Sequence, residues 1–272
     1  MTVAAPNRAP ISPLHGMLSR IELQPDARKL NLIVNHPDVY PWVRGPAQGE
    51  LDITPAFERG DVLCLLAEHG GILFQMLQPG LYEAHTQVLP EGRGAWAVRC
   101  VSACLHWLFT HTDAIEVVTK CPEGNLASKG LARAIHGRYQ FTNPKGWVMD
   151  DKPIPADIYS LTVQDWMRTA PGLVDRGKWF HERLKAEFER HGVAEQSHAE
   201  DPTHDRYVGA ACEMILGGQP EKAAIFFNRY AVMGGYAPVE IVSLEPMAFN
   251  IGNATVVVRG DEFWVPKLRP LH

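Results

Sequence analysis

The sequence predicts an α+β fold, with a mixed, mostly antiparallel central sheet flanked by helices and a smaller α+β unit after it. Two β-rich runs, residues 61–67 and 71–78, flank the hairpin signal Glu68–Gly71. A third run, residues 82–89, completes a three-strand meander. A glycine-containing turn, an apolar-faced helical segment and the β-branched run at 114–120 follow, which adds a helical crossover to the meander.

Length and composition are those of an ordinary globular protein. The chain has 272 residues, 46% hydrophobic and 21% charged, which suits one large or two ordinary domains. Its formal net charge is -5, which gives no whole-chain attraction to nucleic acid or to acidic membranes. The N-terminus lacks a signal-peptide pattern, and no apolar run is long enough to cross a bilayer.

The five cysteines are an odd number without paired spacing, which argues against a disulfide framework. Cys100 and Cys104 share a predicted helix face, and we interpret them as buried small hydrophobes. No second Cys/His pair stands at ligand spacing, so no metal is expected. These features are typical of a reducing cytoplasm, or of a particle assembled in a host cytoplasm.

Proline and glycine clusters predict the domain organisation. Residues 1–18 form a Pro-rich arm, and residues 19–168 form the first domain. The breaker cluster Thr169–Gly172 separates it from a C-terminal domain, residues 173–272. Within the first domain we expect a strand at Leu18–Leu23, helix at Lys29–Val34, and closing strands at Gln140–Trp147 and Ile158–Val163.

The segment from His36 to Pro46 predicts an aromatic-rich loop. Tyr40 and Trp42 either line a pocket or pin the loop by burial.

The C-terminal domain shows no catalytic signature and predicts a surface for docking onto the first domain or onto another protein. A polar, His-rich segment at 195–205 is interpreted as a solvated loop, in which Asp201 or Asp205 caps the next helix. Its other predicted elements are helices at Leu173–His191, Arg206–Leu216 and Glu221–Val232, and strands at Val239–Leu244, Ala254–Val258 and Phe263–Val265.

The turn Pro90–Gly94 joins the third strand of the meander to the long helix. Its two glycines permit positive φ or a close approach of a ligand to the backbone. Free N–H groups and the positive end of a helix meet at such a turn, so the arrangement suits a phosphate.

This arrangement resembles the GNAT acyltransferases. The lead-in Leu89-Pro90-Glu91 with Arg93-Gly94 is similar to the family's entry into its pyrophosphate loop, and Asn125-Leu126-Ala127-Ser128 is similar to its Asn-x-x-Ala/Ser signature. The resemblance implies that acetyl-CoA binds where the strand at 114–120 splays from the strand before the turn. It also implies that the cofactor is held by these residues: Gly92, Arg93, Gly94, Ala95, Ala97 and Asn125.

Three positions depart from the family pattern. The family loop reads Arg-Gly-x-Gly-x-Gly or Ala, whereas Trp96 stands at its central glycine and Val98 at its last small residue. An indole there is expected to crowd the pyrophosphate. The family's usual acid is a Tyr seven residues after the Asn, and that position is Ala132; the nearest tyrosine in sequence is Tyr139.

The third strand of the meander carries the candidate general base. Strand alternation places Glu83, His85 and Gln87 on one face. The resemblance implies that Glu83 or His85 takes a proton from an amine. The alternative, that both belong to a polar outer face of the sheet, is equally compatible with the pattern.

Three hypotheses of function remain. The chain is similar to GNAT-related proteins encoded among the virion genes of tailed bacteriophages, in its PEGRG turn, its PEGN helix start and the segment HDRYVGAACEMI. That similarity implies a structural or internal virion component with a degraded coenzyme A site. Its partners would be other protein chains, in a homo-oligomer or a virion. The alternatives are an acetyl-CoA-dependent N-acetyltransferase and a sensor that uses the cleft between the splayed strands.

Overall fold

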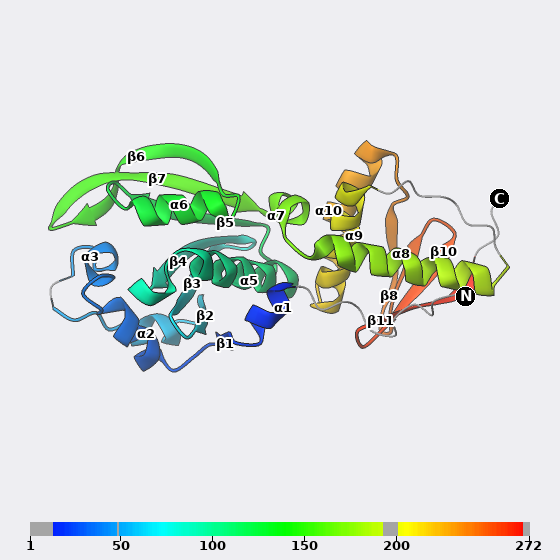
Figure 1. Cartoon of the computed structure of the whole chain (residues 1–272), viewed down its shortest axis with the longest axis horizontal. Helices are drawn as coiled ribbons and strands as arrows, with labels where there is room; N and C mark the ends of the chain where they lie inside the picture. The colour runs from blue at the N-terminus through cyan, green and yellow to red at the C-terminus, as the bar shows by residue number, and fades with distance from the viewer. Residues whose placement is uncertain (1–12, 48, 193–200, 269–272) are drawn as a thin grey trace. The chain divides into compact units, whose positions relative to one another are not determined.

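The computed structural model describes residues 13–47, 49–192 and 201–268, and Figure 1 shows their secondary structure. The chain divides into two compact units. The seven-stranded unit comprises residues 14–108 and 113–166, and the four-stranded unit comprises the other described residues. Together they form the α+β architecture that the sequence predicts, so the expected fold class is confirmed.

The sheet of the seven-stranded unit has the order β1-β2-β3-β4-β5-β7-β6. Every neighbouring pair is antiparallel except β4 and β5, which are parallel and joined by a helical crossover. The strands are β1 (Glu22–Leu23), β2 (Val62–Ala67), β3 (Gly70–Gln78), β4 (Leu81–Val88), β5 (Glu116–Pro122), β6 (Arg138–Met149) and β7 (Lys152–Thr162).

The hairpin between β2 and β3 depends on two glycines at its tip. Gly70 has a φ of +144°, and a Cβ atom there would lie 2.2 Å from the Gln87 carbonyl oxygen. A Cβ atom on Gly71 would lie 2.0 Å from the carbonyl oxygen of Leu65. Only glycine fits both places, because any side chain would collide with a neighbouring strand.

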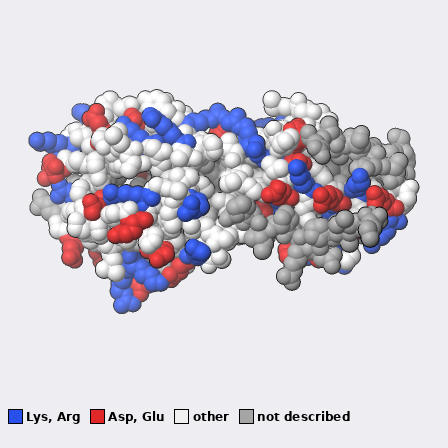
Figure 2. All heavy atoms as spheres, viewed as in Figure 1, with Lys and Arg blue, Asp and Glu red and all other residues white. Residues whose placement is uncertain are grey.

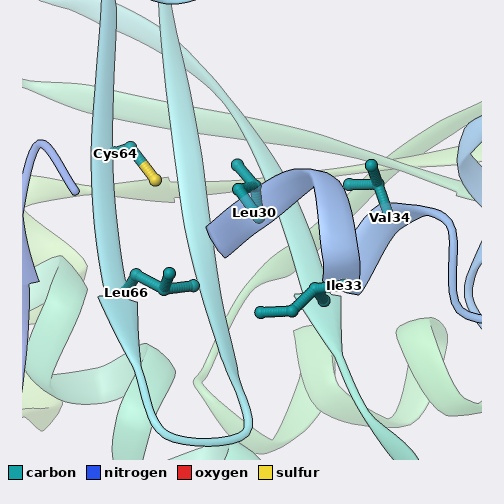
Figure 3. Close-up of a cluster of buried hydrophobic side chains, with 5 residues drawn as sticks. All are labelled: Leu30, Ile33, Val34, Cys64 and Leu66. Atoms are coloured by element: carbon teal, nitrogen blue, oxygen red, sulfur yellow. The ribbon is translucent and has the colours of Figure 1, made fainter. Parts of the chain in front are cut away.

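Helix α2 (Ala27–Val34) packs on this sheet through its apolar face. Leu30 and Ile33 point from the helix toward Cys64 and Leu66 on β2, as Figure 3 shows, and Val34 belongs to the same buried cluster. The predicted amphipathic helix is therefore confirmed. The other helical elements of this unit are α1 (Pro13–Leu18), α3 (Tyr40–Val43), α4 (Thr54–Glu58), the 3₁₀ turn η1 (Pro90–Gly92), α5 (Ala95–His111), α6 (Leu126–Ala134) and α7 (Val163–Thr169). Helices α1, α5 and α7 each have residues in both units.

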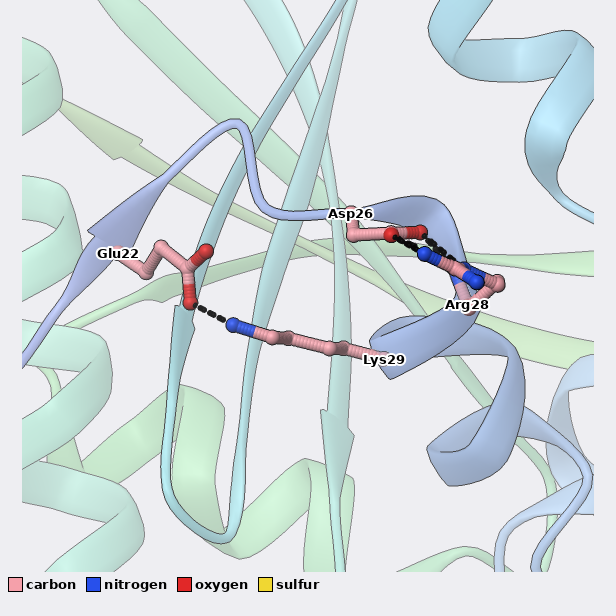
Figure 4. Close-up of polar contacts among 4 residues, drawn as sticks. All are labelled: Glu22, Asp26, Arg28 and Lys29. Atoms are coloured by element: carbon pink, nitrogen blue, oxygen red, sulfur yellow. Dashed lines mark hydrogen bonds and ion pairs between the residues drawn. The ribbon is translucent and has the colours of Figure 1, made fainter.

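Polar contacts fix the start of α2. Asp26 is its N-cap and accepts from the Arg28 backbone N–H at 3.0 Å, while Lys29 pairs with Glu22 (Figure 4). Hydrogen bonds from the Arg28 side chain and backbone lower the pKa of Asp26 to about 2, so this cap stays ionised well into the acid range.

Three local predictions were wrong. Leu18–Leu23 is not one strand, because α1 occupies its start and only Glu22–Leu23 pairs with β2. The aromatic segment contains α3, since Pro41 is accepted in the first turn of a helix. The closing strands are longer than expected because Asp150 and Asp151 take positive φ and make a tight turn between β6 and β7, seen in Figure 1 as a long curved hairpin.

The four-stranded unit combines an antiparallel sheet with three long helices. Gly177 on α8 (Leu173–Arg190) and Gly209 on α9 (Pro202–Leu216) bring these helices into backbone contact. Cβ atoms added there would lie 2.0 and 1.9 Å from the carbonyl oxygens of Asp205 and Leu173. Asp201 caps α9 by accepting from the Thr203 N–H at 2.8 Å, as predicted. The elements are α8 (Leu173–Arg190), α9 (Pro202–Leu216), α10 (Pro220–Gly234), β8 (Val239–Leu244), β9 (Met247–Ile251), β10 (Ala254–Arg259) and β11 (Glu262–Leu268), with the sheet order β11-β10-β9-β8.

All five cysteines are free and buried, which confirms their interpretation as small hydrophobes. Within the described ranges, no helix has the length and apolarity needed to span a membrane. Acidic and basic side chains are interspersed on the face of the molecule seen in Figure 2. Residues 1–12 of the predicted N-terminal arm and residues 193–200 of the His-rich segment lie outside the described part of the chain.

Candidate active site

The parallel pair β4–β5 separates part of the way along its length. Ladder pairing runs from Leu81↔Glu116 to Glu83↔Val118 and then stops. At the next position the hydroxyl of Thr119 donates to the carbonyl oxygen of Ala84 at 2.9 Å, in place of a backbone bond. Beyond that contact the strands are splayed, as the resemblance in sequence implied.

A cavity of about 340 Å³ lies at this splay. All four consecutive residues Ala84, His85, Thr86 and Gln87 line it. Successive strand residues point to opposite faces of a sheet, so the cavity extends through the split from one face to the other. Helix α3 contributes Trp42, which lines the pocket, whereas the Tyr40 hydroxyl donates to the Gly49 carbonyl oxygen.

Glu83, His85 and Lys120 form a charged cluster where the strands part. The Lys120 ammonium lies 3.0 and 3.1 Å from the two carboxylate oxygens of Glu83. The His85 Nε2 lies 3.8 Å from the nearer of these oxygens. Glu83 is only 6% exposed and His85 is half-buried, so the alternative of a polar outer face is wrong.

His85 is the member of this cluster that suits a general base. It lines the cavity, and burial lowers its pKa, helped by Lys120 and opposed by Glu83. The imidazole is therefore neutral, and able to accept a proton, at lower pH than an ordinary histidine. The carboxylate of Glu83 is already engaged by Lys120, so Glu83 is better placed to balance charge than to take a proton.

The turn before α5 presents a row of backbone donors. The N–H groups of Gly92 and Arg93 donate within the turn, to Leu89 and Pro90. The first intrahelical bond of α5 runs from Val98 to Gly94. The N–H groups of Ala95, Trp96 and Ala97 therefore have no carbonyl partner within the helix. They lie at the positive end of a 17-residue helix.

Trp96 does not fill the cavity. Its indole packs edge-on against the His69 ring, with 5.2 Å between centroids, and its Cε3 atom lies near Gly92. Like all of residues 90–97, it is absent from the cavity lining among the described residues. Trp96 stands where the resemblance implies a glycine, and its indole packs on the turn between β2 and β3.

Two more of the predicted cofactor residues have structural partners. Asn125 lines the cavity and caps α6 by accepting from the Ser128 N–H at 3.0 Å. The guanidinium of Arg93 donates to the Asp38 carbonyl oxygen at 3.2 Å. This bond connects the loop before α3 to the turn Pro90–Gly94. The assignment of Gly92, Arg93, Gly94, Ala95, Ala97 and Asn125 to a cofactor stays a prediction.

Three polar side chains in the cavity lining have a buried atom without a hydrogen-bond partner in the described structure. These atoms are Gln87 Oε1, Trp147 Nε1 and the Tyr159 hydroxyl. Such groups are uncommon in folded proteins, because each lacks the hydrogen bond it makes in water. A ligand that both donates and accepts hydrogen bonds would satisfy them.

Charges on the cavity wall are few. Among the described residues that line it there is no carboxylate, and the two permanent cations, Arg59 and Lys120, are each paired with an acidic neighbour. The wall is otherwise apolar, aromatic or neutral. This surface does not favour a polycationic ligand.

Comparison with known proteins gives similarities to solved structures alone. No protein-family profile and no curated protein sequence matches the chain. A GNAT-family acetyltransferase from Bacillus anthracis is 15% identical with a TM-score of 0.44, over 53% of this chain and 95% of that one. Spermidine N-acetyltransferase from Vibrio cholerae is 11% identical with a TM-score of 0.44, over 53% and 96%. The microcin C7 self-immunity acetyltransferase, solved with acetyl-CoA and AMP, is 15% identical with a TM-score of 0.44, over 53% and 93%.

Sequence reasoning found part of this site. The splay, the turn and the pair Glu83 and His85 were predicted. Lys120, Trp147 and Tyr159 were missed as site residues. The signal for Lys120 was present, since a parallel neighbour of β4 places the residue two after Val118 beside His85.

Proposed function

We propose that the chain is an acetyl-CoA-dependent N-acyltransferase that transfers an acetyl group to an amine. The observation that carries this function is the cavity at the β4–β5 splay, which is lined by His85. The indole of Trp96 packs on His69 and Gly92, and its crowding of the pyrophosphate stays a prediction that titration with acetyl-CoA tests.

The cofactor would lie along the splay with its pyrophosphate at the first turn of α5. The N–H groups of Ala95 to Ala97 and the helix dipole stabilise an anion there. The amide groups of the pantetheine arm both donate and accept, which matches the unpaired Gln87 and Trp147 atoms. Asn125, at the start of α6, lies on the same cavity wall.

The thioester carbonyl would meet the free backbone edge of β4. Because the Ala84 carbonyl faces β5, strand alternation turns the peptide groups of Thr86 to the same side. With β5 splayed away, the Thr86 N–H is placed to donate to the oxygen of a tetrahedral intermediate.

The amine acceptor would be activated by His85. The amine nitrogen attacks the thioester carbon, and neutral His85 takes the proton that the nitrogen loses. Burial keeps His85 neutral near neutral pH. A proton acceptor that lines the cavity next to the free edge of β4 is the geometry that this reaction needs.

Calorimetric titration with acetyl-CoA, followed by release of free CoA in the presence of amines, tests this function. We expect binding by the wild type, and binding with about 100-fold slower turnover by His85→Ala. Glu68→Gln, at the exposed β2–β3 turn, is a matched control that should keep both. Absence of acetyl-CoA binding by the folded wild type would rule the function out.

Association with other chains stays a prediction, and so does a place in a virion. Exposed apolar side chains on α10, namely Ile225, Val232 and Met233, are compatible with assembly. The predicted domain limits 1–18, 19–168 and 173–272 and the docking role of the last domain are likewise retained as proposals.

A further inference from the structure

His85 lies on the side of the cavity that helix α2 covers. In the β3–β4 ladder His85 is opposite Leu73, and opposite residues on paired strands lie on the same face of a sheet. Leu73 packs against the buried cluster that α2 forms with β2. In the reaction proposed above the acceptor gives a proton to His85, so the amine would bind on this side.

The wall around this side is apolar and aromatic. Val43, Leu51 and Ile53 line the cavity and pack against the same buried cluster. Trp42 of α3 lines the cavity as well. Its ring reaches the turn between β5 and α6, where the indole Cη2 atom lies 3.8 Å from the position of a Cβ atom added to Gly124. The wall therefore offers an indole and aliphatic side chains to an acceptor.

A second indole comes to this side from β6. Trp147 lines the cavity and is opposite Ile154 in the β6–β7 ladder. Ile158, four residues further along β7, shares the face of Ile154 and is opposite Lys120 on β5. Lys120 belongs with His85 to the charged cluster at the splay. Trp147 is thus on the face of the sheet that carries His85.

An ion pair connects the two elements that carry these indoles. Arg44, at the end of α3, pairs with Asp150 in the turn between β6 and β7. The helix that carries Trp42 and the hairpin that carries Trp147 are therefore held to each other. A wall that is fixed in this way loses little conformational entropy when a ligand binds, and its two indoles favour a flat ring over a flexible chain.

The charges on the lining decide which kind of amine fits. Among the described residues of the lining, the permanent charges are the cations of Arg59 and Lys120. The carboxylate that pairs with Lys120 belongs to Glu83, which is 6% exposed and is not one of these residues. An ammonium group that leaves water to lie beside a cation loses hydration and is repelled. An amine that is uncharged in water avoids both effects.

Aromatic amines are uncharged in this way. In an aniline the nitrogen lone pair is delocalised into the ring, so the nitrogen is not protonated at neutral pH. An alkylamine, like the side chain of lysine, is protonated at the same pH and has to lose a proton before it can attack a thioester. An aniline therefore combines a ring that suits the two indoles with a nitrogen that needs no counter-ion.

We propose that the acceptor is an arylamine, bound with its ring against Trp42 and Trp147 and its nitrogen toward His85. The inference rests on the proposed function and names the acceptor of the same site. The nitrogen forms a bond to the acetyl carbon, and the carbon–sulfur bond breaks with its electron pair on sulfur. His85 takes the proton that the nitrogen loses and returns it, through solvent, to the thiolate. The products are an N-aryl acetamide and coenzyme A thiol.

The first test compares three acceptors at neutral pH, with acetyl-CoA as the donor and free thiol as the readout. The compound p-anisidine is an uncharged arylamine, phenethylamine is a protonated amine with a similar ring, and spermidine is a polycation. We expect kcat/KM to be highest for p-anisidine, by about tenfold or more over phenethylamine. Calorimetric titration of the protein–coenzyme A complex with p-anisidine and phenethylamine should give the same order of affinity, which separates binding from nucleophilicity.

Two variants assign the preference to residues. Trp42→Leu keeps an apolar side chain but removes the indole, so it should raise KM for p-anisidine about fivefold with little change in kcat or in KM for acetyl-CoA. The matched control Tyr40→Phe, on the same helix, removes a hydroxyl that donates to the Gly49 carbonyl oxygen and should keep the wild-type kinetics. Lys120→Met removes a cation from the wall and should raise kcat/KM for phenethylamine relative to p-anisidine. A change in the basicity of His85 affects both acceptors and cancels in this ratio.

The outcomes separate this inference from the proposed function. A kcat/KM for phenethylamine or spermidine that equals or exceeds that for p-anisidine would overturn the inference and leave the function standing. Thiol release with none of these amines, by a wild type that binds acetyl-CoA, would overturn the inference as well, and so would an acceptor preference that is unchanged in both Trp42→Leu and Lys120→Met. Wild type that does not bind acetyl-CoA would overturn the proposed function and the inference with it.

Discussion

The carboxylate of Glu83 and the ammonium of Lys120 meet across the last paired position of β4 and β5, at 3.0 and 3.1 Å. The pair therefore marks the point at which the two strands part. It also sets the electrostatic environment of His85, since Glu83 raises the pKa of this imidazole while Lys120 lowers it. The cluster allows the two contributions to be separated by substitution.

Lys120→Met should raise the pKa of His85, and Glu83→Gln should lower it further. The first removes a cation that disfavours imidazolium, and the second removes an anion that favours it. NMR titration of the His85 ring measures both shifts. Lys120→Met also leaves the buried Glu83 carboxylate without its cation, at a cost of about 2 kcal/mol in unfolding free energy. Equal His85 pKa values in wild type and both variants would contradict this account.

Acetyl transfer should persist to lower pH than an ordinary histidine allows. Burial lowers the folded pKa of His85, so the neutral base remains below pH of about 6.5, and activity falls only as pH drops through the lowered value. A profile of kcat/KM against pH shows this acid limb. His85→Gln should abolish it together with most of the activity, by about 100-fold. An acid limb that survives in this variant would assign the base to another residue.

Asp157 should stabilise the protein at neutral pH but not in acid. Hydrogen bonds from Lys129 and Thr142 lower its folded pKa. Because the unfolded carboxylate titrates near pH 3.9, the contribution is present above that pH and is lost as pH falls through the folded pKa. Asp157→Asn should cost about 1 kcal/mol at pH 7. Urea unfolding at pH 7 and pH 2.5 tests this, and a cost that is unchanged at the lower pH would contradict it.

Gly71→Ala and Gly130→Ala should have opposite effects on stability. At Gly71 the added Cβ would collide with the Leu65 carbonyl oxygen at 2.0 Å, and we expect a loss of more than about 2 kcal/mol. At Gly130, inside α6, no atom lies within 4 Å of the added Cβ, so alanine should stabilise by about 0.5–1 kcal/mol. Thermal unfolding of the two variants gives the comparison. Destabilisation by Gly130→Ala would show that the surroundings of α6 are not as open as described.

Trp96→Ala should not increase affinity for acetyl-CoA. The indole packs on His69 and Gly92 and is not part of the cavity wall. Its loss should lower stability by about 1–2 kcal/mol, because the ring is half-buried. Calorimetry and thermal unfolding measure the two effects. A large gain in affinity would restore the idea of a blocked site.

The fold was predictable where its signals are local. The β2–β3 hairpin is marked by Gly70 and Gly71, and the crossover to β5 by the turn Pro90–Gly94. The limits of β6 and β7 were not predictable. They depend on a turn in which Asp150 and Asp151 both take positive φ, and an aspartate does not by itself indicate that conformation. Before β2, helix α2 was predicted, but α1 and α3 were misread because such short helices have few periodic positions.

The site was predictable only along single strands. Alternation placed Glu83 and His85 on one face of β4. Tyr159 was missed because β7 is distant in sequence and comes beside β5 only through sheet pairing, with Thr119 opposite Tyr159.

The bond from the Thr119 hydroxyl to the Ala84 carbonyl ends the β4–β5 ladder. A peptide N–H belongs to every residue except proline, whereas a hydroxyl at this point belongs to one side chain. The depth of the opening between the strands is therefore under the control of one amino-acid position. Substitution at 119 can lengthen or shorten the cavity between the strands while the rest of the sheet keeps its register.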